Sequence, residues 1–580
     1  MLEIVILSIV TWLAYWGVIN CGFVSDDIEG LQNYDGKLKK FDYGHLNKWL
    51  LYKLLDKSPR RNHLFSIFLH NVNVILLFAF LATILPAKLA FYSCLIFAIH
   101  PICIQSVGWI SGRGYPISLF FCLLGFNIAS SAPLASFPLS GDILNQGYLA
   151  LLVIGYGFLY YLSVTAQFAA LATFAIQLFL GNYFLGFIGF LISSFAGAGI
   201  IKEVINIRVK TFKEQNLGQS TIFRFTKIIV AIKTFAYYTR LCLFPKRLGL
   251  YHTFEYHYSE KTEKENKWFW LGFIMLLGFM AGLWFGNNVV RFAILWYLAY
   301  IFTFLNWITI HQFVSERYLY IASIGVYILI AYGLFTLDTF LFSGYPVILA
   351  LACGLYLMRT WVHLPTYQDE VLFYQSNIWN FPDSEVAFAN LGVVYMRCGL
   401  TNSAIDMWQI SGKINSHYDV AWYNIHSVLK QKGDLNGSRE FLKKAIDSPG
   451  CHFRDHWTGE LQQLDHEINY VNELNQLSQQ LVLIEKNPAK QQEVANIRKQ
   501  LDEINSLHKK FEEFKKQNLV LIQQEEQQLK TKLVQLEKTK EEISKPLKME
   551  DLIKARDNNF SFVKEAVNNM LKIETIDAKT

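Results

Sequence analysis

Long apolar stretches separated by short polar ones fill the first 360 residues of the chain. A helix needs roughly 20 mostly apolar residues to cross a bilayer core, where every backbone polar group must be satisfied internally. We therefore predict an all-α, polytopic helix bundle with about eleven spans, at residues 2–20, 64–86, 88–107, 115–132, 147–163, 165–181, 182–201, 267–286, 290–309, 317–336 and 343–360. The first stretch lacks a basic n-region and a small-residue cleavage site, so we expect a retained span and not a signal peptide.

One further stretch, 226–244, carries three basic residues among aromatics, which is typical of a helix lying at the membrane interface. An odd number of spans puts the two termini on opposite sides. Loop 21–63 carries eight Lys and Arg residues and 202–247 is also basic, so loop charge alone would make their side cytoplasmic. Both segments are long and contain candidate interfacial helices, and this rule is weakest for such segments.

A repeat follows the last predicted span. The pattern Ala387, Asn390, Leu391 and Gly399 recurs at 421, 424, 425 and 433, with Ile in the third place and a constant offset of 34 residues. That offset is the period of the tetratricopeptide repeat (TPR), a helix–turn–helix unit that stacks on its neighbours. Such repeats usually hold peptides or partner proteins in a concave groove. We therefore predict TPR-like repeats that contact a protein partner.

The last third of the chain is dense in Lys, Glu and Gln. Apolar residues recur there at intervals of three and four between 455 and 545, which indicates long helices in a coiled coil or a helical hairpin. Solvated helices with one apolar stripe packed on the repeats are the alternative. The expected organisation is a membrane domain at 1–360, TPR-like repeats at 361–454 and a charged helical, coiled-coil-like region at 455–580.

Composition narrows the class of protein further. Hydrophobic residues make up 52% of the chain and charged residues 17%, against about 25% charged in ordinary soluble domains. The net charge of +6 comes without a compact basic patch that contains aromatics, so we expect no nucleic acid partner. The eight cysteines form no CxxC pair, and no metal-ligand spacing stands out. We therefore predict no metal and no cofactor.

Four polar clusters lie beside predicted spans, and each also has a structural explanation, such as a helix cap, an interfacial aromatic or a contact with lipid head groups. Ionisable groups beside a span are costly and are therefore candidates for function. The clusters are Asp26 and Asp27 after the first span; His100, Gln105 and Arg113 around the end of the third; Lys246 and Arg247 after the stretch 226–244; and His311, Glu316, Arg317 and Tyr318 at the tenth.

Together these clusters suit transfer of a group from a lipid-phosphate donor. A carboxylate near the first span can take the proton of an acceptor hydroxyl. Arginine and lysine can stabilise the leaving phosphate, where negative charge develops. The lipid tail would stay in the bilayer. In the eleven-span arrangement these side chains lie on one side of the membrane.

At these residues the chain resembles the GT-C superfamily of polyprenyl-phosphate-sugar glycosyltransferases. Within it, the likeness is to the transmembrane-and-TPR O-mannosyltransferases and their bacterial relatives. It covers roughly residues 1–450, in order. The segments that carry it are FVSDDIEGLQN, HPICIQSVGWISGRG, YYTRLCLFPKRLGLYH, SERYLYIASIG and the run from RTWVHLPTYQDE to VVYMRCG. This chain has Gln105 and Tyr115 at positions where relatives often have Glu and Asp.

The resemblance implies that loop 21–63 and the repeats face the lumen or periplasm, and this implication overrides the loop charge. It also implies that Asp26, within the Asp26–Asp27 pair, is the catalytic base. We expect a bacterial inner-membrane protein, with the endoplasmic reticulum as the alternative location, whose C-terminal region is extracytoplasmic.

The predicted function is an inverting hexosyltransferase reaction. A sugar passes from a polyprenyl-phosphate carrier to a hydroxyl of a protein or glycan acceptor. The donor phosphate would bind Arg317, Arg113, Lys246 and Arg247, with His100, Glu316, Tyr318 and His311 in support. Two alternatives stay open. One is a non-enzymatic membrane scaffold that holds partners through its repeats and coiled coil. The other is a lipid-linked glycan ligase or polymerase, against which the aspartate pair argues.

Overall fold

The computed structural model describes residues 1–34, 36–37, 49, 51–131, 176, 180, 225–252, 263–306, 314–338, 345–416, 418–449, 451, 453–485, 490–510 and 513. All regular structure in these residues is helical, and no strand occurs among them. The chain divides into two compact units, Met1–Leu461 and Gln462–Thr580. The all-α prediction is therefore confirmed for the described part of the chain.

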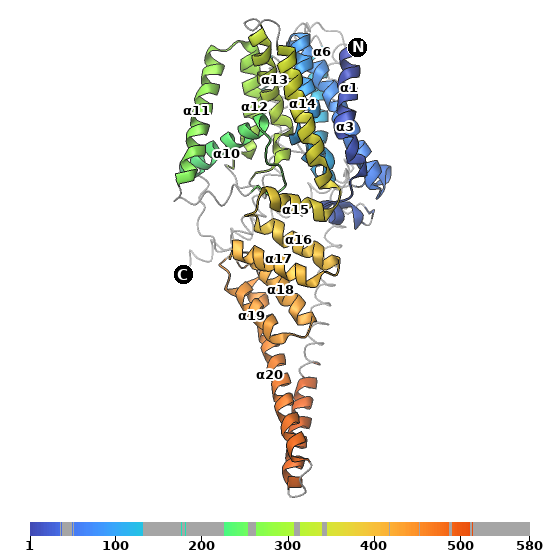
Figure 1. The fold of residues 1–580 in the computed structure, drawn as a ribbon, viewed down its shortest axis with the longest axis vertical. Helices are drawn as coiled ribbons and strands as arrows, with labels where there is room; N and C mark the ends of the chain where they lie inside the picture. Colours follow the sequence, from blue (N-terminus) through green and yellow to red (C-terminus); the bar gives the residue numbers. More distant parts are fainter. Residues whose placement is uncertain are drawn as a thin grey trace, which may run out of the picture. The chain divides into compact units, whose positions relative to one another are not determined.

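The first unit begins with a bundle of long helices (Figure 1). Short helical turns connect several of them at one end of the bundle. Its elements are α1 (Leu2–Tyr15), η1 (Trp16–Asn20), the π-helical turn η2 (Ile28–Gln32), α3 (Pro59–Ile84), α4 (Ala87–Ile99), η3 (Pro101–Cys103), α5 (Ile104–Gly108), η4 (Ile110–Arg113), α6 (Gly114–Ser131), α10 (Phe225–Leu243), α11 (Glu263–Phe285), α12 (Asn288–Ile301), η6 (Phe302–Phe304), η7 (Glu316–Tyr318), α13 (Leu319–Asp338), α14 (Tyr345–His363) and η8 (Leu364–Tyr367).

Five helical segments in the described residues are long and apolar enough to cross a membrane: Leu2–Asn20, Pro59–Ile84, Lys267–Phe285, Glu316–Leu337 and Pro346–Tyr367. A bent pair, Ala87–Ile99 and Pro101–Gly108, would make a sixth. The helix Asn288–Phe304 is apolar but shorter than the span predicted at 290–309. Apart from residues 176 and 180, the spans predicted at 147–163, 165–181 and 182–201 lie outside the described residues, so the count of about eleven stays a prediction.

The outer faces of two helices carry the apolar surface that a bilayer would cover. Only 6% of the Lys267–Phe285 span is buried inside the protein, and Ile274 and Trp284 are largely exposed on it. On α14, Leu351 and Leu355 are exposed in the same way. Contiguous apolar surface of this kind marks an interaction site in a water-soluble protein, whereas lipid tails solvate it without penalty. The exposure therefore agrees with helices that face lipid.

The third predicted span, 88–107, is broken where Pro101 follows His100. The two halves meet at a bend of 50°, because proline removes a backbone donor and its ring clashes with the preceding turn. His100 has extended backbone and its side chain accepts the Ile102 N–H, so it caps the second half. The bend carries α5 and η4 across the end of the bundle, where they meet the residues that follow α1.

Beyond the bundle, α15 (Glu370–Asn380) leads into two helix pairs, α16 (Glu385–Arg397) with α17 (Thr401–Ile414) and α18 (Asp419–Gln431) with α19 (Leu435–Asp447). The pairs repeat: Gly399 and Gly433, 34 positions apart, both follow a helix and have φ of 77° and 79°. Glycine adopts this left-handed backbone without strain, which ends a helix cleanly. The helix pairs thus follow the predicted period, while their assignment to the tetratricopeptide family stays a prediction.

The helix pairs are attached to the bundle at the end where the first and last spans finish (Figure 1). The backbone N–H of Gly22 donates to the Gln368 carbonyl over 2.9 Å, which joins the end of the first span to the end of the last one. The Asn390 amide on α16 donates to the Tyr251 hydroxyl over 3.0 Å. The bundle and the first helix pair therefore lie in one compact unit.

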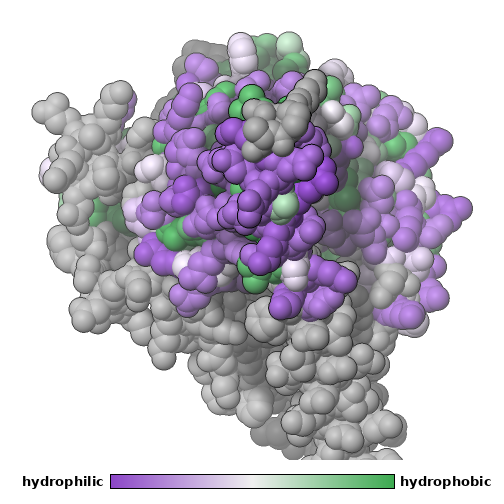
Figure 2. All heavy atoms as spheres, turned by 90° about the horizontal axis from the view of Figure 1, so that it is seen from below, coloured by the Kyte–Doolittle hydropathy of each residue, from purple (hydrophilic) through white to green (hydrophobic). Residues whose placement is uncertain are grey.

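The second unit begins inside α20 (Arg454–Ile484) and includes a helix over residues 490–510. These two helices lie side by side, since Tyr470 donates to Asn505 over 2.9 Å and stacks on His508 with ring centroids 3.8 Å apart. The described C-terminal helices expose mainly hydrophilic residues (Figure 2). The predicted apolar pattern beyond residue 513 lies outside the described residues.

Candidate functional site at the end of the helix bundle

The aspartate pair follows a strained turn. Ser25 has a φ of 54°, which is costly for a residue that has a Cβ. Asp27 is completely buried. Its carboxylate accepts the N–H groups of Val24, Ile110 and Ser111 at 3.5, 3.3 and 2.7 Å and the Ser111 hydroxyl at 2.6 Å. Asp27 therefore joins the segment after α1 to the turn after α5.

Burial raises the pKa of Asp27 from 3.8 to about 6, because the charged form loses its water, while the bonds from Ser111, Val24 and Ile110 oppose the shift. Asp26 differs sharply from its neighbour. Its side chain is exposed and lies beside Tyr251 and Tyr374. Burial is the main cause that raises the pKa values of these two tyrosines, and the negative charge of Asp26 adds to the rise. Asp26 is thus a solvent-accessible carboxylate, whereas the carboxylate of the neighbouring Asp27 is buried and held by hydrogen bonds.

Trp109 connects the aspartate segment to Arg317. Its indole N–H donates to the Val24 carbonyl over 3.2 Å. The Arg317 guanidinium lies over the Trp109 ring at 4.8 Å and over the Tyr318 ring at 5.4 Å, a favourable cation–π arrangement. Arg317 is partly buried, and its Nη1 has no hydrogen-bond partner. One buried tryptophan therefore contacts both the predicted cation and the segment that carries the predicted base.

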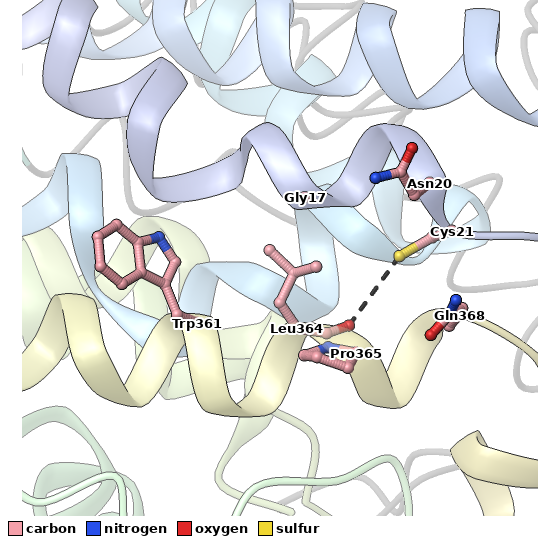
Figure 3. Close-up of a pocket in the computed structure, with 7 residues that line it drawn as sticks. All are labelled: Gly17, Asn20, Cys21, Trp361, Leu364, Pro365 and Gln368. Carbon is pink, nitrogen blue, oxygen red and sulfur yellow. Dashed lines mark hydrogen bonds between the residues drawn. The ribbon is translucent and has the colours of Figure 1, made fainter.

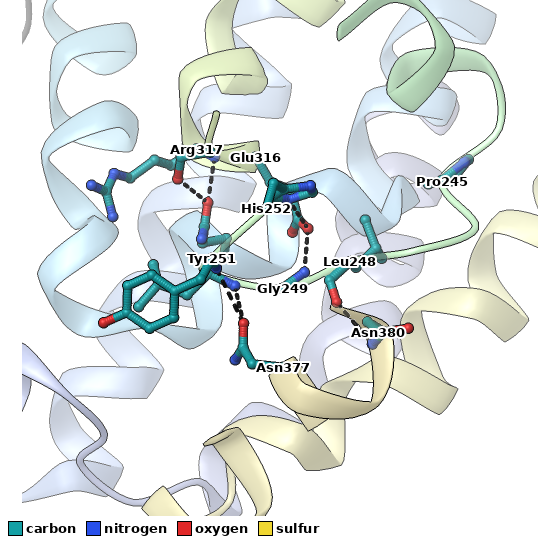
Figure 4. Close-up of polar contacts among 12 residues, drawn as sticks. Pro245, Leu248, Gly249, Tyr251, His252, Glu316, Arg317, Asn377 and Asn380 are labelled. Atoms are coloured by element: carbon teal, nitrogen blue, oxygen red, sulfur yellow. Dashed lines mark hydrogen bonds and ion pairs between the residues drawn. The ribbon is translucent and has the colours of Figure 1, made fainter. Parts of the chain in front are cut away.

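Glu316 and Arg317 are neighbours in sequence, but their side chains point in different directions (Figure 4). The Glu316 carboxylate is fully buried, accepts the Gly249 N–H over 2.6 Å and pairs with His252 Nε2 at 3.2 Å. This contact holds the loop that follows α10 against the start of α13. Because both partners are fully buried, we assign Glu316 to positioning this loop and not to contact with solvent.

The loop 244–252 is held from the other side by α15 and α14 (Figure 4). Asn377 accepts the N–H groups of Leu250 and Tyr251 at 2.6 and 3.2 Å. Asn380 donates to the Leu248 carbonyl over 3.0 Å. Arg359 donates to the carbonyls of Pro245 and Lys246 at 3.2 and 2.8 Å. The side chains of Lys246 and Arg247 stay exposed on this anchored loop.

Arg113 and His100 make internal contacts. The Arg113 guanidinium donates to the Ser66 hydroxyl and to the carbonyl and side-chain oxygens of Asn62, all at 3.1 Å. It therefore ties α3 to the turn before α6. His100 is fully buried and its Nδ1 accepts the Ile102 N–H, so Nε2 carries the proton and donates to the Cys242 carbonyl over 3.1 Å.

Of the other predicted residues, Tyr318 is buried and stacks on Phe304, with ring centroids 4.5 Å apart. His311 lies outside the described residues. Two further residues noted in the sequence both contact Arg317: Gln105 accepts its backbone N–H over 2.6 Å, and the Tyr115 side chain lies against its guanidinium.

A pocket of about 280 Å³ opens beside this region (Figure 3). Residues of η1 and the first turn after it face residues of α14 and η8 across the pocket, and the Cys21 thiol donates to the Leu364 carbonyl at 4.0 Å. The lining residues are Gly17, Asn20, Cys21, Trp361, Leu364, Pro365 and Gln368. The pocket therefore lies at the end of the first and last spans, next to the segment that leads to Asp26.

Sequence reasoning missed two residues of this site, Ser111 and Asn377. Ser111 lies in the Trp109–Arg113 stretch that the sequence already marked, but nothing local relates it to Asp27, 84 positions away. Asn377 lies beyond the last span, 127 positions from Leu250. In the sequence, the signal at Asn377 was a polar residue on a helix with one apolar face. That signal does not indicate which residue the asparagine contacts.

Among the described residues, no group of three or more His, Cys, Asp or Glu side chains is arranged to hold a metal ion. No protein-family model, no curated protein and no solved structure matches this chain.

Proposed function

We propose that this chain is a GT-C-type membrane glycosyltransferase that moves a sugar from a polyprenyl-phosphate donor to an acceptor hydroxyl. One observation carries the proposal. The exposed carboxylate Asp26 follows Val24 by two positions, and the Val24 carbonyl accepts the indole N–H of Trp109. The Arg317 guanidinium, which has no ion-pair partner among the described residues, lies over the ring of the same Trp109 at one end of an apolar helix bundle. A base and a cation for a leaving phosphate are the two groups that this reaction needs.

In the proposed reaction the acceptor hydroxyl oxygen attacks the anomeric carbon of the sugar. Asp26 takes the hydroxyl proton as the new bond forms. The bond between the anomeric carbon and the phosphate oxygen breaks, and the lipid phosphate leaves with the electron pair. Arg317 stabilises the charge that develops on that phosphate. A single displacement of this kind inverts the configuration at the sugar carbon.

Exposure and hydrogen bonding divide the two aspartates between two roles. The carboxylate oxygens of Asp27 accept hydrogen bonds from Ile110, Ser111 and Val24. We therefore assign Asp27 to shaping the site and holding Asp26 in place. Asp26 is exposed to solvent and is the base of the proposal. A base must reach the proton that it abstracts, and a buried carboxylate with four donors around it cannot move to do so.

The cations divide in a similar way. Arg113 directs its donors to Asn62 and Ser66, which makes it a link between helices. Lys246 and Arg247 are exposed on the loop 244–252, where they can meet the phosphate of a lipid whose tail stays in the bilayer. We therefore propose Arg317 as the main phosphate ligand, with these two exposed cations beside it.

The chain would act in the bacterial inner membrane, or in the endoplasmic reticulum, with the helix pairs on the extracytoplasmic side. The attachment of α15 and α16 to the loop 244–252, through Asn377 and Asn390, supports a role for these helices in delivering a protein or glycan acceptor to the site.

The test is donor-dependent sugar transfer by membranes that contain the full chain, with labelled polyprenyl-phosphate sugars and expression checked. Arg317→Ala should raise the donor KM by about tenfold or more, because it removes a charged contact worth roughly 1.5–3 kcal/mol. Arg291→Ala is the matched control: its guanidinium bonds the carbonyls of Leu283 and Trp284 between α11 and α12, so the donor KM should not change. Equal donor KM values in both variants would refute the phosphate role.

A non-enzymatic scaffold is the second candidate, favoured by the repeated helix pairs and by the hydrophilic C-terminal helices. In that case the cellular phenotype would depend on the repeats and not on Asp26. Loss of partner capture in a chain that lacks residues 383–450, together with an unchanged phenotype in Asp26→Asn, would favour the scaffold.

A further inference from the structure

Asp26 lies in a turn whose two ends are fixed. The Asp27 N–H donates to the Val24 carbonyl over 3.1 Å and closes the turn. The same carbonyl accepts the Trp109 indole N–H, and both Val24 and Asp27 are fully buried. Ser25 is the one residue between the fixed Val24 and Asp26. The backbone conformation of Ser25 therefore determines where the exposed Asp26 side chain points.

Ser25 has a conformation that a serine adopts only at a cost. Its φ of 54° is left-handed, and a turn with positive φ at its second position favours glycine. Strained backbone of this kind persists only where the surrounding structure holds it, and it clusters at functional sites. The hydroxyl is the group that serine has and glycine lacks. Its contacts therefore indicate why a strained serine is used here.

Two tyrosines from outside the turn contact the Ser25 hydroxyl. Tyr374 belongs to α15 and Tyr251 to the loop 244–252, and the phenol of each forms a hydrogen bond with Ser25. One hydroxyl can donate to one phenol and accept from the other. The Tyr251 phenol also accepts the Asn390 amide of α16 over 3.0 Å. The strained turn is therefore held by α15 directly and by α16 through Tyr251.

The elements that carry these phenols are joined to each other. Asn377 of α15 accepts the Tyr251 N–H over 3.2 Å (Figure 4). The Arg397 guanidinium of α16 pairs with Glu370 of α15 over 2.7 Å. Tyr374 is buried, so its ring has little freedom to move. The two phenols are thus presented to Ser25 from one connected support, which lies beyond the last span in the sequence.

We propose that α15 and α16 hold the turn Val24–Asp27 in the conformation that presents Asp26 to the acceptor hydroxyl. Ser25 is the positioning residue through which they act. The inference rests on the proposed function and deepens it. It makes the first helices after the last span part of the catalytic step in the membrane domain, in addition to their role in delivering the acceptor.

Tyr374→Phe tests this inference, because it removes one phenol oxygen from Ser25 and keeps the buried ring. The assay is transfer from the labelled polyprenyl-phosphate sugar that the wild-type chain uses, in membranes that contain the full chain at matched expression. The rate at saturating donor should fall about tenfold or more, because a displaced base loses its alignment with the acceptor hydroxyl. The donor KM should not change, since no phosphate contact is altered.

Tyr395→Phe is the matched control. The Tyr395 hydroxyl of α16 accepts the Gln375 amide of α15 over 3.3 Å, so this variant also loses one contact between the same two helices, but none with Ser25. Its transfer rate should equal that of the wild-type chain. An equal fall in Tyr374→Phe and Tyr395→Phe would overturn the inference, because it would show a general effect of loosening α15 and α16.

Substitutions of Ser25 separate positioning from stability. Ser25→Ala and Ser25→Gly both remove the hydroxyl, but only glycine also relieves the left-handed strain. Ser25→Gly should therefore unfold at a higher temperature than Ser25→Ala, while the transfer rate should fall about tenfold or more in both. The double variant Ser25→Gly with Tyr374→Phe should be no slower than the slower single variant, because both changes remove the same contact. A rate near that of the wild-type chain in Ser25→Gly would overturn the role of the hydroxyl.

Failure of this inference differs from failure of the proposed function. If Asp26→Asn abolishes transfer while Tyr374→Phe and Ser25→Gly keep the wild-type rate, the positioning role is overturned and the proposed function stands. If Tyr374→Phe raises the donor KM and leaves the saturated rate unchanged, the positioning role is also overturned. If the wild-type chain transfers no sugar from any labelled donor, or Asp26→Asn keeps the full rate, both proposals are overturned.

Discussion

Asp27→Asn should destabilise the protein in a pH-dependent way. Asp27 has two oxygens that accept bonds from the turn after α5 and from Val24. Asparagine keeps one of these oxygens and replaces the other with a donor, so at least one backbone N–H loses its acceptor. Leaving a buried donor unsatisfied costs about 1–3 kcal/mol. This part of the loss does not depend on pH.

The pH-dependent part follows from the pKa of Asp27, which burial raises from 3.8 to about 6 in the folded chain. The folded state therefore binds this proton more tightly than the unfolded state does. Its contribution to stability is complete below pH 4 and is lost as the pH rises through 6. A shift of about two pKa units corresponds to roughly 3 kcal/mol. Asparagine does not titrate, so the wild-type advantage over the variant should shrink by that amount between pH 4 and pH 7.

Thermal unfolding in detergent, at one scan rate and at several pH values, measures this difference. Asp26→Asn is the matched control, because the same substitution at the exposed neighbour removes no buried contact and should leave the unfolding temperature close to that of the wild-type chain. A gap between wild type and Asp27→Asn that stays constant from pH 4 to pH 7 would refute the buried, proton-binding role of Asp27. No gap at any pH would refute its structural role as well.

Three further substitutions probe the loop 244–252 and the turn of the second helix pair. Asn377→Ala leaves the N–H groups of Leu250 and Tyr251 without an acceptor, so their amide hydrogen exchange should become faster, while unchanged exchange would contradict the anchoring role. Gly433→Ala should cost about 1 kcal/mol because its φ of 79° is left-handed. Gly459→Ala, in a helix and with open space around an added Cβ, should instead be neutral or stabilising by roughly 0.5–1 kcal/mol; equal effects in a thermal unfolding assay would contradict the argument from φ.

Features that depend on local pattern could be predicted from the sequence. Apolar length predicted the helices of the bundle, and the offset between Gly399 and Gly433 predicted where the two helix pairs turn. Both signals are local, since a span needs only enough apolar residues and a turn needs only a residue that tolerates positive φ. The bend at Pro101 has an equally local cause, although the stretch 88–107 was predicted as one span with no bend named.

Features that depend on contacts between distant parts of the chain could not be predicted from the sequence. Asp26 and Asp27 are indistinguishable in sequence, yet only the second finds Ser111 in its surroundings. In the sequence, Arg113 was as good a candidate for a phosphate ligand as Arg317. In the structure its guanidinium donates to Ser66, 47 positions away. Buried ionisable groups make contacts that hold the fold together, and which groups are buried depends on packing between distant segments. The pairing of Glu316 with His252 is a further contact of this kind.

The rate of sugar transfer by Asp26→Asn tests the central claim most directly. The substitution keeps the shape of the side chain and removes its basicity, and loss of a general base typically lowers a rate ~10²–10⁴-fold. With a saturating polyprenyl-phosphate sugar donor and matched expression, we predict a fall of that size in the initial rate of transfer, with lipid binding retained. A transfer rate equal to that of the wild-type chain would contradict Asp26 as the base.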